Sequence, residues 1–185
     1  MEKNNKHDLV IIGAGPGGYR AAFMAADLGL EVTLIDPEIN PGGVCLYRGC
    51  IPTKALLHLS KIKKDAEEAA DMGIKFTSAE VDVDKIRNWK DKVVKKLTGG
   101  LGQLVKAHKI TYMKGMAKFL DSKTLEVDLT DEGKKKISFK NVIIATGASP
   151  IQLPNVKTDD PRIMNSAASL DLKDIPGKML VIGGG

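Results

Sequence analysis

Residues 9–19 have the sequence Leu-Val-Ile-Ile-Gly-Ala-Gly-Pro-Gly-Gly-Tyr, and this stretch decides the fold. The unbroken apolar run at 9–12 is typical of a strand that is buried on both faces of a sheet. A glycine turn follows it, and residues 19–28 are rich in alanine, which predicts a helix. Residues 31–36 predict the next strand. Because two parallel strands need a crossover between them, these segments predict one βαβ unit.

The glycines at positions 13, 15 and 18 have the Gly-x-Gly-x-x-Gly spacing of a dinucleotide-binding turn. Gly13 allows the tight turn, Gly15 lets the backbone approach a pyrophosphate, and Gly18 lets the helix pack closely on the strand. The phosphates would lie over the helix N-terminus, where free N–H groups favour anions. Asp36, at the end of the next strand, can accept hydrogen bonds from a ribose and would repel a 2′-phosphate. A plain turn with glycines for packing is the alternative.

Cys45 and Cys50 lie in a second glycine-rich stretch, residues 42–54, which reads Gly-Gly-Val-Cys-Leu-Tyr-Arg-Gly-Cys-Ile-Pro-Thr-Lys. In a regular helix five residues rise about 7.5 Å, which is too far for a disulfide. The pair can close only if the backbone is distorted, and Gly49 supplies that freedom. Pro52 predicts that Cys50 lies just ahead of a helix, where we expect a lowered thiol pKa. Two unrelated buried thiols are the alternative.

The rest of the chain predicts further helices and short strands. Residues 37–51 are expected to form an irregular loop, 52–72 a helix, and a second long helix begins near Asp82 or Asp84 and reaches Lys106. Three glycines inside that helix weaken it by roughly 1 kcal/mol each: Gly99, Gly100 and Gly102. Short strands are expected at 110–113, at Phe119, at 125–129 and at 136–139, and a buried strand at 142–145. Residues 178–182 have a strand pattern before a second glycine turn, which indicates a fragment cut where another nucleotide-binding domain opens.

Composition excludes several classes of protein. The net charge is +5, but aromatic residues make up only 4% of the chain and the basic residues are scattered, which argues against nucleic-acid binding. An acidic protein partner stays open. No apolar run approaches the ~18 residues of a membrane span, and the first eight residues are polar, so we expect a cytoplasmic protein. His7, His58 and His108 lack metal-ligand spacing and are expected at the surface or in packing.

Several motifs together resemble the pyridine nucleotide–disulfide oxidoreductase family, and within it the N-terminal part of the dihydrolipoamide dehydrogenases. They lie at residues 13–19, 42–57, 115–119, 145–147 and 181–185. Glutathione and mercuric reductases share the cysteine motif and are the alternative within the family. Four residues depart from the commonest form of that motif: Val44, Tyr47, Arg48 and Thr53.

The resemblance implies a Rossmann-like α/β fold, with a parallel sheet and a small antiparallel β meander. Residues 1–150 would form an FAD-binding domain with a redox disulfide, and residues 151–185 a connector with the first strand and glycine turn of a truncated NAD-binding domain. The residues implied to contact FAD are Gly13, Gly15, Pro16, Gly17, Gly18, Asp36, Pro37, Gly42, Gly43, Val44, Cys45, Lys54, Ala117, Ala145, Thr146, Gly147 and Ala148. No metal site is expected.

The resemblance also implies an activity, the oxidation of protein-bound dihydrolipoamide to lipoamide with reduction of NAD⁺ to NADH. Cys45 would exchange with the substrate disulfide, Cys50 would pass electrons to the flavin, and Lys54 would lie near the flavin ring. The base that activates the substrate thiol would come from a His–Glu pair absent from this chain. Implied partners are a lipoyl domain of a 2-oxo acid dehydrogenase or glycine cleavage complex, and a second subunit in a homodimer. A flavin-binding module without turnover of its own is the alternative.

Overall fold

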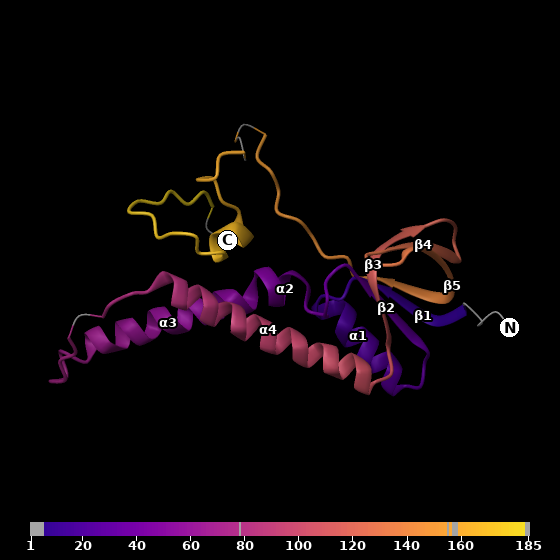
Figure 1. Ribbon diagram of the computed structural model, residues 1–185, viewed down its shortest axis with the longest axis horizontal. Helices are drawn as coiled ribbons and strands as arrows, with labels where there is room; N and C mark the ends of the chain where they lie inside the picture. The colour runs from indigo at the N-terminus through magenta and orange to yellow at the C-terminus, as the bar shows by residue number, and fades with distance from the viewer. Residues whose placement is uncertain (1–5, 78, 155, 157–158, 184–185) are drawn as a thin grey trace.

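The structure, a computed structural model, describes residues 6–77, 79–154, 156 and 159–183. A sheet lies at one end of the molecule and a long arm of two helices extends from it (Figure 1). The elements in chain order are β1 (Lys6–Ile12), α1 (Pro16–Asp27), β2 (Val32–Asp36), α2 (Gly43–Arg48), α3 (Cys50–Glu68), α4 (Val83–Ala107), β3 (Thr111–Phe119), β4 (Thr124–Leu129), β5 (Gly133–Ile144) and α5 (Ser166–Leu170).

The sheet has a parallel part and an antiparallel part that share two long strands. β1 pairs in parallel with β2 and with β5, and β2 pairs in parallel with β3. Beyond the parallel part, β3 and β5 both pair with β4 in antiparallel register, so that the five strands form a closed ring. This arrangement confirms the expected Rossmann-like α/β fold with a small antiparallel meander.

The parallel strands are buried on both faces, which explains the unbroken apolar run at 9–12. Ile11 packs on one face in a cluster that contains Phe23 of α1. Val10 packs on the other face in a cluster that contains Leu125 of β4. The molecule therefore has three layers at this end, with helices on one side of the parallel sheet and the meander on the other (Figure 1).

Helix ends agree with the sequence where a local signal marks them. Gly29, with φ +85°, follows α1 in the left-handed conformation expected there. Asp82 is the N-cap of α4, and its side chain accepts a hydrogen bond from the Lys85 N–H at 2.9 Å. α3 differs from the prediction, because it begins at Cys50 and ends at Glu68 rather than spanning 52–72. Pro52 fits inside the first turn, where a missing N–H breaks no helical bond.

The short strands predicted at 110–113 and Phe119 merge into β3, and those at 136–139 and 142–145 merge into β5. Each long strand serves the parallel part with one half and the meander with the other. The prediction that 142–145 is buried was wrong, because Ile143 is 37% and Ile144 is 65% exposed. In this half of β5, β1 covers one edge, and no described strand pairs with the other edge.

The strand predicted at 178–182 does not form. Residues 178–183 contain no strand, and Leu180 is 86% exposed. No described strand lies beside this segment to accept its backbone hydrogen bonds, which accounts for the difference. Residues 184–185 of the predicted glycine turn lie outside the described part of the chain, and the division into two domains stays a prediction. Within the described residues, no helix combines the length and apolar character needed to cross a membrane.

Candidate dinucleotide and dithiol site

The candidate site lies at the carboxyl ends of the parallel strands. The turn after β1 is tied to both neighbours, because Gly13 N–H donates to Ile35 O at 2.8 Å and Ala145 N–H donates to Ile12 O at 2.8 Å. The chain leaves β1 for β2 on one side, and β5 flanks β1 on the other. Ligands of open α/β sheets bind at such a point, where the strand order reverses.

Gly13 and Gly18 are required by packing. Gly13 has φ +96°, and a Cβ there would lie 2.3 Å from Ala145 O. A Cβ on Gly18 would lie 1.8 Å from Gly13 O. Both distances are far inside van der Waals contact, so the tight turn and close helix packing expected of these two positions are present.

Gly15 and Gly17, in contrast, border open space. A Cβ on Gly15 would have only the Gly43 Cα within 4 Å, at 3.9 Å, and a Cβ on Gly17 would have no such neighbour. Pro16 is the first residue of α1, so this space lies at the N-terminus of the helix. A side chain on Gly15 would fill a cradle bordered by backbone N–H groups, and this shape fits the pyrophosphate of a dinucleotide.

Asp36 is 8% exposed, and its carboxylate already has two partners. Oδ2 accepts a hydrogen bond from Ala14 N–H at 2.7 Å, and Oδ1 accepts one from Glu38 N–H at 2.9 Å. The side chain thus ties the glycine turn to the start of the next loop, a role that the sequence did not predict. Each oxygen keeps a lone pair for a ribose hydroxyl, and the ribose contact stays a prediction.

Residues 43–48 form the short helix α2, where the sequence predicted an irregular loop. Gly42 N–H donates to Ala14 O at 2.9 Å. A Cβ on Gly43 would lie 2.6 Å from the Gly15 Cα, so the cysteine segment lies directly on the glycine turn. Leu46 is the one buried hydrophobic residue of this helix, too little apolar periodicity to predict it from sequence.

Cys45 and Cys50 come together as expected, with Gly49 as the distorted position between them. Cys45 lies in α2 and Cys50 is the first residue of α3, and the backbone leaves the helical region at Gly49 with φ −144° and ψ −108°. A hydrogen bond with the Cys50 thiol is the largest influence on Cys45 and raises its pKa. Burial raises this pKa further, and the Lys54 charge lowers it. Both residues are free thiols here, and their disulfide in the oxidised protein stays a prediction.

Other residues implied by the resemblance lie in three further places. Lys54 lies one turn into α3 and is exposed, and Thr146, Gly147 and Ala148 form an exposed segment after β5. Ala117 lies on the meander, where it pairs with Val127 of β4 and packs against the core there.

Loop 37–42, between β2 and α2, is held by residues that sequence reasoning did not place in the site. Tyr112 Oη donates to Glu38 O at 2.9 Å, and Tyr47 Oη donates to Asn40 O at 3.0 Å. The Arg48 guanidinium forms an ion pair with the Glu38 carboxylate. Burial raises the pKa of both tyrosines, so both hydroxyls remain donors. The departure of Tyr47 and Arg48 from the family motif was the one sequence signal for this loop.

Gly102 of α4 contacts the same loop. A Cβ there would lie 2.2 Å from Asn40 Oδ1, so this glycine allows the loop to approach the helix. A Cβ on Gly99 or on Gly100 would have no such neighbour within 4 Å. Of the three glycines predicted to weaken this helix, Gly102 is therefore required by a tertiary contact, the approach of Asn40 to the helix.

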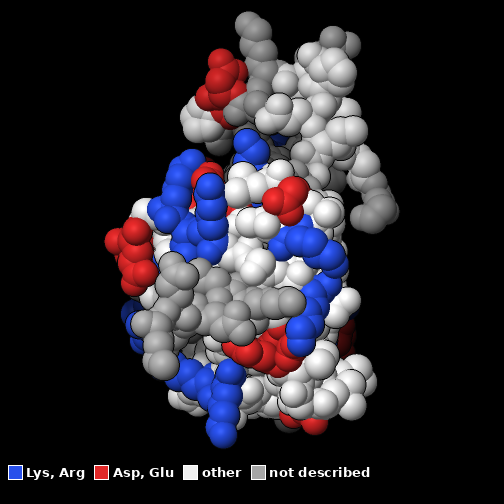
Figure 2. Space-filling model, turned by 90° about the vertical axis from the view of Figure 1, so that its right-hand side faces the viewer, with Lys and Arg blue, Asp and Glu red and all other residues white. Residues whose placement is uncertain are grey.

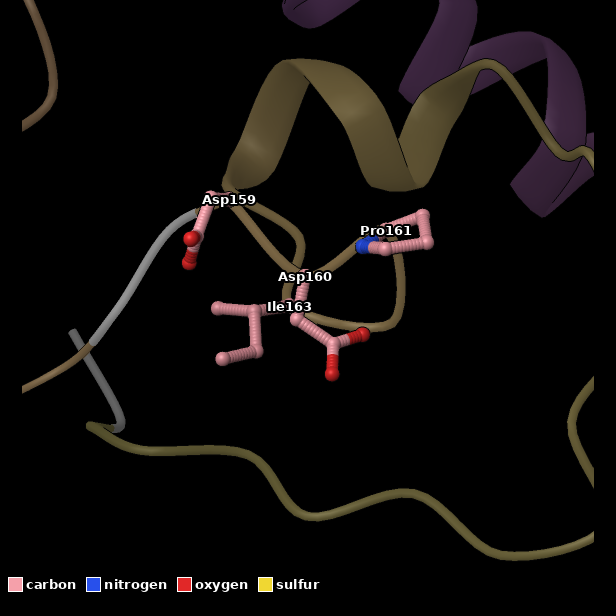
Figure 3. A pocket seen from close by; sticks show the side chains of 4 residues that line it. All are labelled: Asp159, Asp160, Pro161 and Ile163. Carbon is pink, nitrogen blue, oxygen red and sulfur yellow. The ribbon is translucent and has the colours of Figure 1, made fainter.

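Two surface hollows lie away from these residues. One, of about 420 Å³, is lined by Asp159, Asp160, Pro161 and Ile163 (Figure 3). Asp160 there forms an ion pair with Arg162, whose Nη2 lies 2.7 Å from Asp160 Oδ2. The hydrogen bond with Arg162 lowers the pKa of the Asp160 carboxyl to about 2. The other, of about 270 Å³, lies between the ends of α1 and α4 and includes Asp27 and His108.

The three histidines have packing partners rather than a shared site. His7 is buried, and its Nδ1 is 2.9 Å from Thr33 Oγ1. His58 stacks on Trp89, with ring centroids 6.2 Å apart, and His108 stacks on Phe23 at 4.8 Å. No group of three potential metal ligands occurs among the described residues.

The basic runs of the sequence lie among acidic side chains. On α3, Lys61, Lys63 and Lys64 each pair with an acid on the next turn. Figure 2 shows positive and negative groups interspersed on the face at the sheet end, where Lys134 pairs with Glu126 at 2.9 Å. These lysines therefore form solvated surfaces balanced by acidic partners.

Comparisons with known proteins identify a family and several relatives of this chain. The family model described as pyridine nucleotide-disulphide oxidoreductase matches residues 7–185. Over 185 residues the chain is 47% identical to a dihydrolipoyl dehydrogenase of Vibrio cholerae and 46% identical to one of Haemophilus influenzae, covering all of this chain and 39% of each relative. Over 178 residues it is 47% identical to a dihydrolipoyl dehydrogenase of Bacillus subtilis, covering 96% of this chain and 37% of the relative.

The chain thus spans about two fifths of the length of these curated relatives. The family match covers nearly every residue, and the glycine turn and paired cysteines described above lie within it. The chain belongs to the pyridine nucleotide-disulphide oxidoreductase family.

Proposed function

We propose that this chain is the FAD-binding part of a dihydrolipoyl dehydrogenase, which oxidises a protein-bound dihydrolipoyl group and reduces NAD⁺. The observation that carries the proposal is the contact between the Cys45 and Cys50 thiols on a segment that lies against the glycine turn. The names of the relatives support the substrate class. Bound FAD would supply a two-electron acceptor next to the pair, with NAD⁺ as the final acceptor.

The chemistry of this chain's own residues is a thiol–disulfide exchange. One thiolate of the dihydrolipoyl group attacks Cys45 Sγ of the oxidised pair, the Cys45–Cys50 bond breaks, and Cys50 leaves as a thiolate. The second substrate thiolate then attacks the substrate sulfur of the mixed disulfide, and Cys45 leaves. The substrate loses two electrons and two protons and becomes a disulfide, and the cysteine pair ends as a dithiol.

The protein groups around the pair suit these roles. The half-buried thiol of Cys45 shares a hydrogen bond with the exposed thiol of Cys50. The Lys54 charge lies close enough to lower the pKa of Cys45. Lys54 would therefore stabilise negative charge that develops at the pair. The Gly15 cradle, Asp36 and the segment after β5 would hold the dinucleotide.

The partner and compartment belong to the same proposal. A lipoyl domain of a 2-oxo acid dehydrogenase or glycine cleavage complex would deliver the substrate, and a second subunit would form a homodimer. The cytoplasm is the expected compartment.

The decisive experiment uses only the half-reaction of this chain. The air-oxidised chain is mixed with dihydrolipoamide without oxygen, and protein thiols and lipoamide are then counted. We expect two new thiols per chain for each lipoamide formed, and none in Cys45→Ser or Cys50→Ser. Two reactive thiols in the denatured, air-oxidised and unreduced chain would contradict the proposed disulfide.

A second candidate is a flavin-binding module without turnover of its own, for which the open space beside Gly15 and Gly17 at the start of α1 is the supporting observation. A flavin spectrum in the purified chain, without lipoamide-linked NADH formation, would support it. Formation of NADH from dihydrolipoamide by this chain alone would exclude it.

A further inference from the structure

The glycine turn and the cysteine helix are joined by a continuous series of contacts through loop 37–42. The Asp36 carboxylate accepts the N–H groups of Ala14 and Glu38 at 2.7 and 2.9 Å. The Glu38 carboxylate then pairs with Arg48, whose Nη1 lies 2.6 Å from Oε1. Arg48 is the last residue of α2, the helix that carries Cys45. The series therefore runs from the nucleotide cradle to the dithiol.

Two tyrosines hold the same loop by its backbone. Tyr47, the neighbour of Arg48 on α2, donates to the Asn40 carbonyl, and Tyr112 of β3 donates to the Glu38 carbonyl. The Arg48 guanidinium also lies over the Tyr47 ring, 5.9 Å from its centroid. The loop is thus fixed from α2 at two points and from the sheet at a third. We name the contacts of Glu38 and Asn40 with Tyr47, Arg48 and Tyr112 the loop brace.

Tyr47 and Arg48 are two of the four positions at which the cysteine segment departs from the motif of the resemblance described above. Each has its partner in the loop, so the departures form one structural unit with Glu38 and Asn40. The Glu38 and Arg48 side chains are 27% and 50% exposed, so the pair is open enough to water to respond to a change nearby.

We propose that Tyr47 and Arg48 are positioning residues that couple the adenosine end of the nucleotide site to the dithiol through the loop brace. This inference rests on the proposed function and adds to it the residues that position the dithiol relative to the nucleotide. A nucleotide that engages Asp36 tightens loop 37–42, and the loop holds α2 through Arg48 and Tyr47. Occupancy of the adenosine end alone then lowers the reactivity of Cys45, with no group of the ligand touching a thiol.

The test uses ADP, which carries the adenosine and pyrophosphate but no flavin ring. The reduced chain is labelled with a thiol reagent with and without saturating ADP, and binding is measured separately by calorimetry. We expect ADP to slow labelling of Cys45 about threefold, within the two- to fivefold range of a partly exposed ion pair. The Arg48→Met chain should bind ADP and show almost no slowing. Arg162→Met, which breaks the exposed pair of Arg162 with Asp160, is the matched control and should behave like the wild type.

A charge exchange separates positioning from direct contact with the nucleotide. In the double variant Glu38→Arg, Arg48→Glu the pair is rebuilt with reversed polarity, so the slowing by ADP should return. Slowing that persists in Arg48→Met, slowing that is absent in the ADP-bound wild type, or failure of the exchanged pair to restore it would each overturn the inference. If FAD binds and ADP leaves the thiols unaffected, this inference alone fails. If neither nucleotide binds, the proposed function fails with it.

Discussion

Residues 9–13 and 179–183 have nearly the same pattern, an apolar run followed by glycine, and they have opposite structures. The first run forms β1, and its four apolar side chains are 0–8% exposed. In the second run Met179, Leu180, Val181 and Ile182 are 58–86% exposed and no strand forms. β1 has a parallel neighbour on each side, and the second run has none among the described residues. An apolar run therefore becomes a strand only where the fold supplies partners for its backbone.

The largest expected difference between the two apolar runs is in the rate of amide hydrogen exchange. We expect amides of 9–12 to exchange only through global unfolding, roughly a thousandfold or more slower than those of 180–182. The measurement is exchange followed by mass spectrometry in a sample verified as monomeric by light scattering. Slow exchange at 180–182 in that monomer would mean that the second run has a docking place of its own.

Truncation of one side chain in each apolar run compares how much the two runs contribute to the free energy of unfolding. Ile11 is fully buried, so Ile11→Ala should destabilise the fold by about 2–5 kcal/mol through lost burial and the cavity left behind. Ile182→Ala, in the exposed run, should change stability by less than about 0.5 kcal/mol. Urea unfolding of both variants measures the difference, and equal effects would break the comparison.

A substitution of the packed glycine of the turn, Gly18, should affect stability more than a substitution of Gly17, which borders open space. Gly18→Ala forces a Cβ against Gly13 O and should cost about 1–3 kcal/mol or more. Gly17→Ala meets open space inside α1 and should leave stability unchanged or raise it by up to about 1 kcal/mol. Thermal unfolding checks both. A destabilised Gly17→Ala would show that the space beside it is not open.

His7 provides the smallest effect and the one that depends on pH. Burial lowers the pKa of His7 below 6.5, an influence partly offset by Glu31. The unfolded chain therefore binds the proton more readily, and the stability contributed by neutral His7 is complete above pH 6.5 and is lost as the pH falls through the lower folded pKa. We expect His7→Gln to weaken this loss, and His58→Gln, at a position stacked on Trp89, to leave it unchanged. Urea midpoints between about pH 8 and about pH 5 provide the test, and equal slopes for His7→Gln and wild type would contradict it.

The sequence predicted those parts of the fold whose signals are local. The apolar run at 9–12, the glycine turn and Gly29 placed β1 and α1, and Asp82 marked the start of α4. The cysteine spacing with Gly49 predicted a distorted backbone that brings two thiols together, and the structure confirms that contact.

The errors occur where the partners of a segment decide its structure. α2 has one buried hydrophobic residue, and its place is set by backbone contact with Gly15. The ribose contact of Asp36 stays a prediction, and its hydrogen bonds with Ala14 and Glu38 are an addition that no spacing rule encodes. Ile143 and Ile144 are apolar like the β1 residues and are nonetheless exposed, because neither belongs to the buried clusters that cover the two faces of the sheet.

By itself the sequence determined a βαβ unit with a dinucleotide turn and a close pair of cysteines, because helix periodicity, glycine conformation and residue spacing are local properties of the chain. The tertiary structure alone decided which apolar runs are buried, where α2 lies, and how Arg48 and the two tyrosines hold the loop between the turn and the dithiol. Those outcomes depend on hydrogen-bond and packing partners tens of residues away, as with Tyr112 and Glu38, and pattern along the chain does not record such partners.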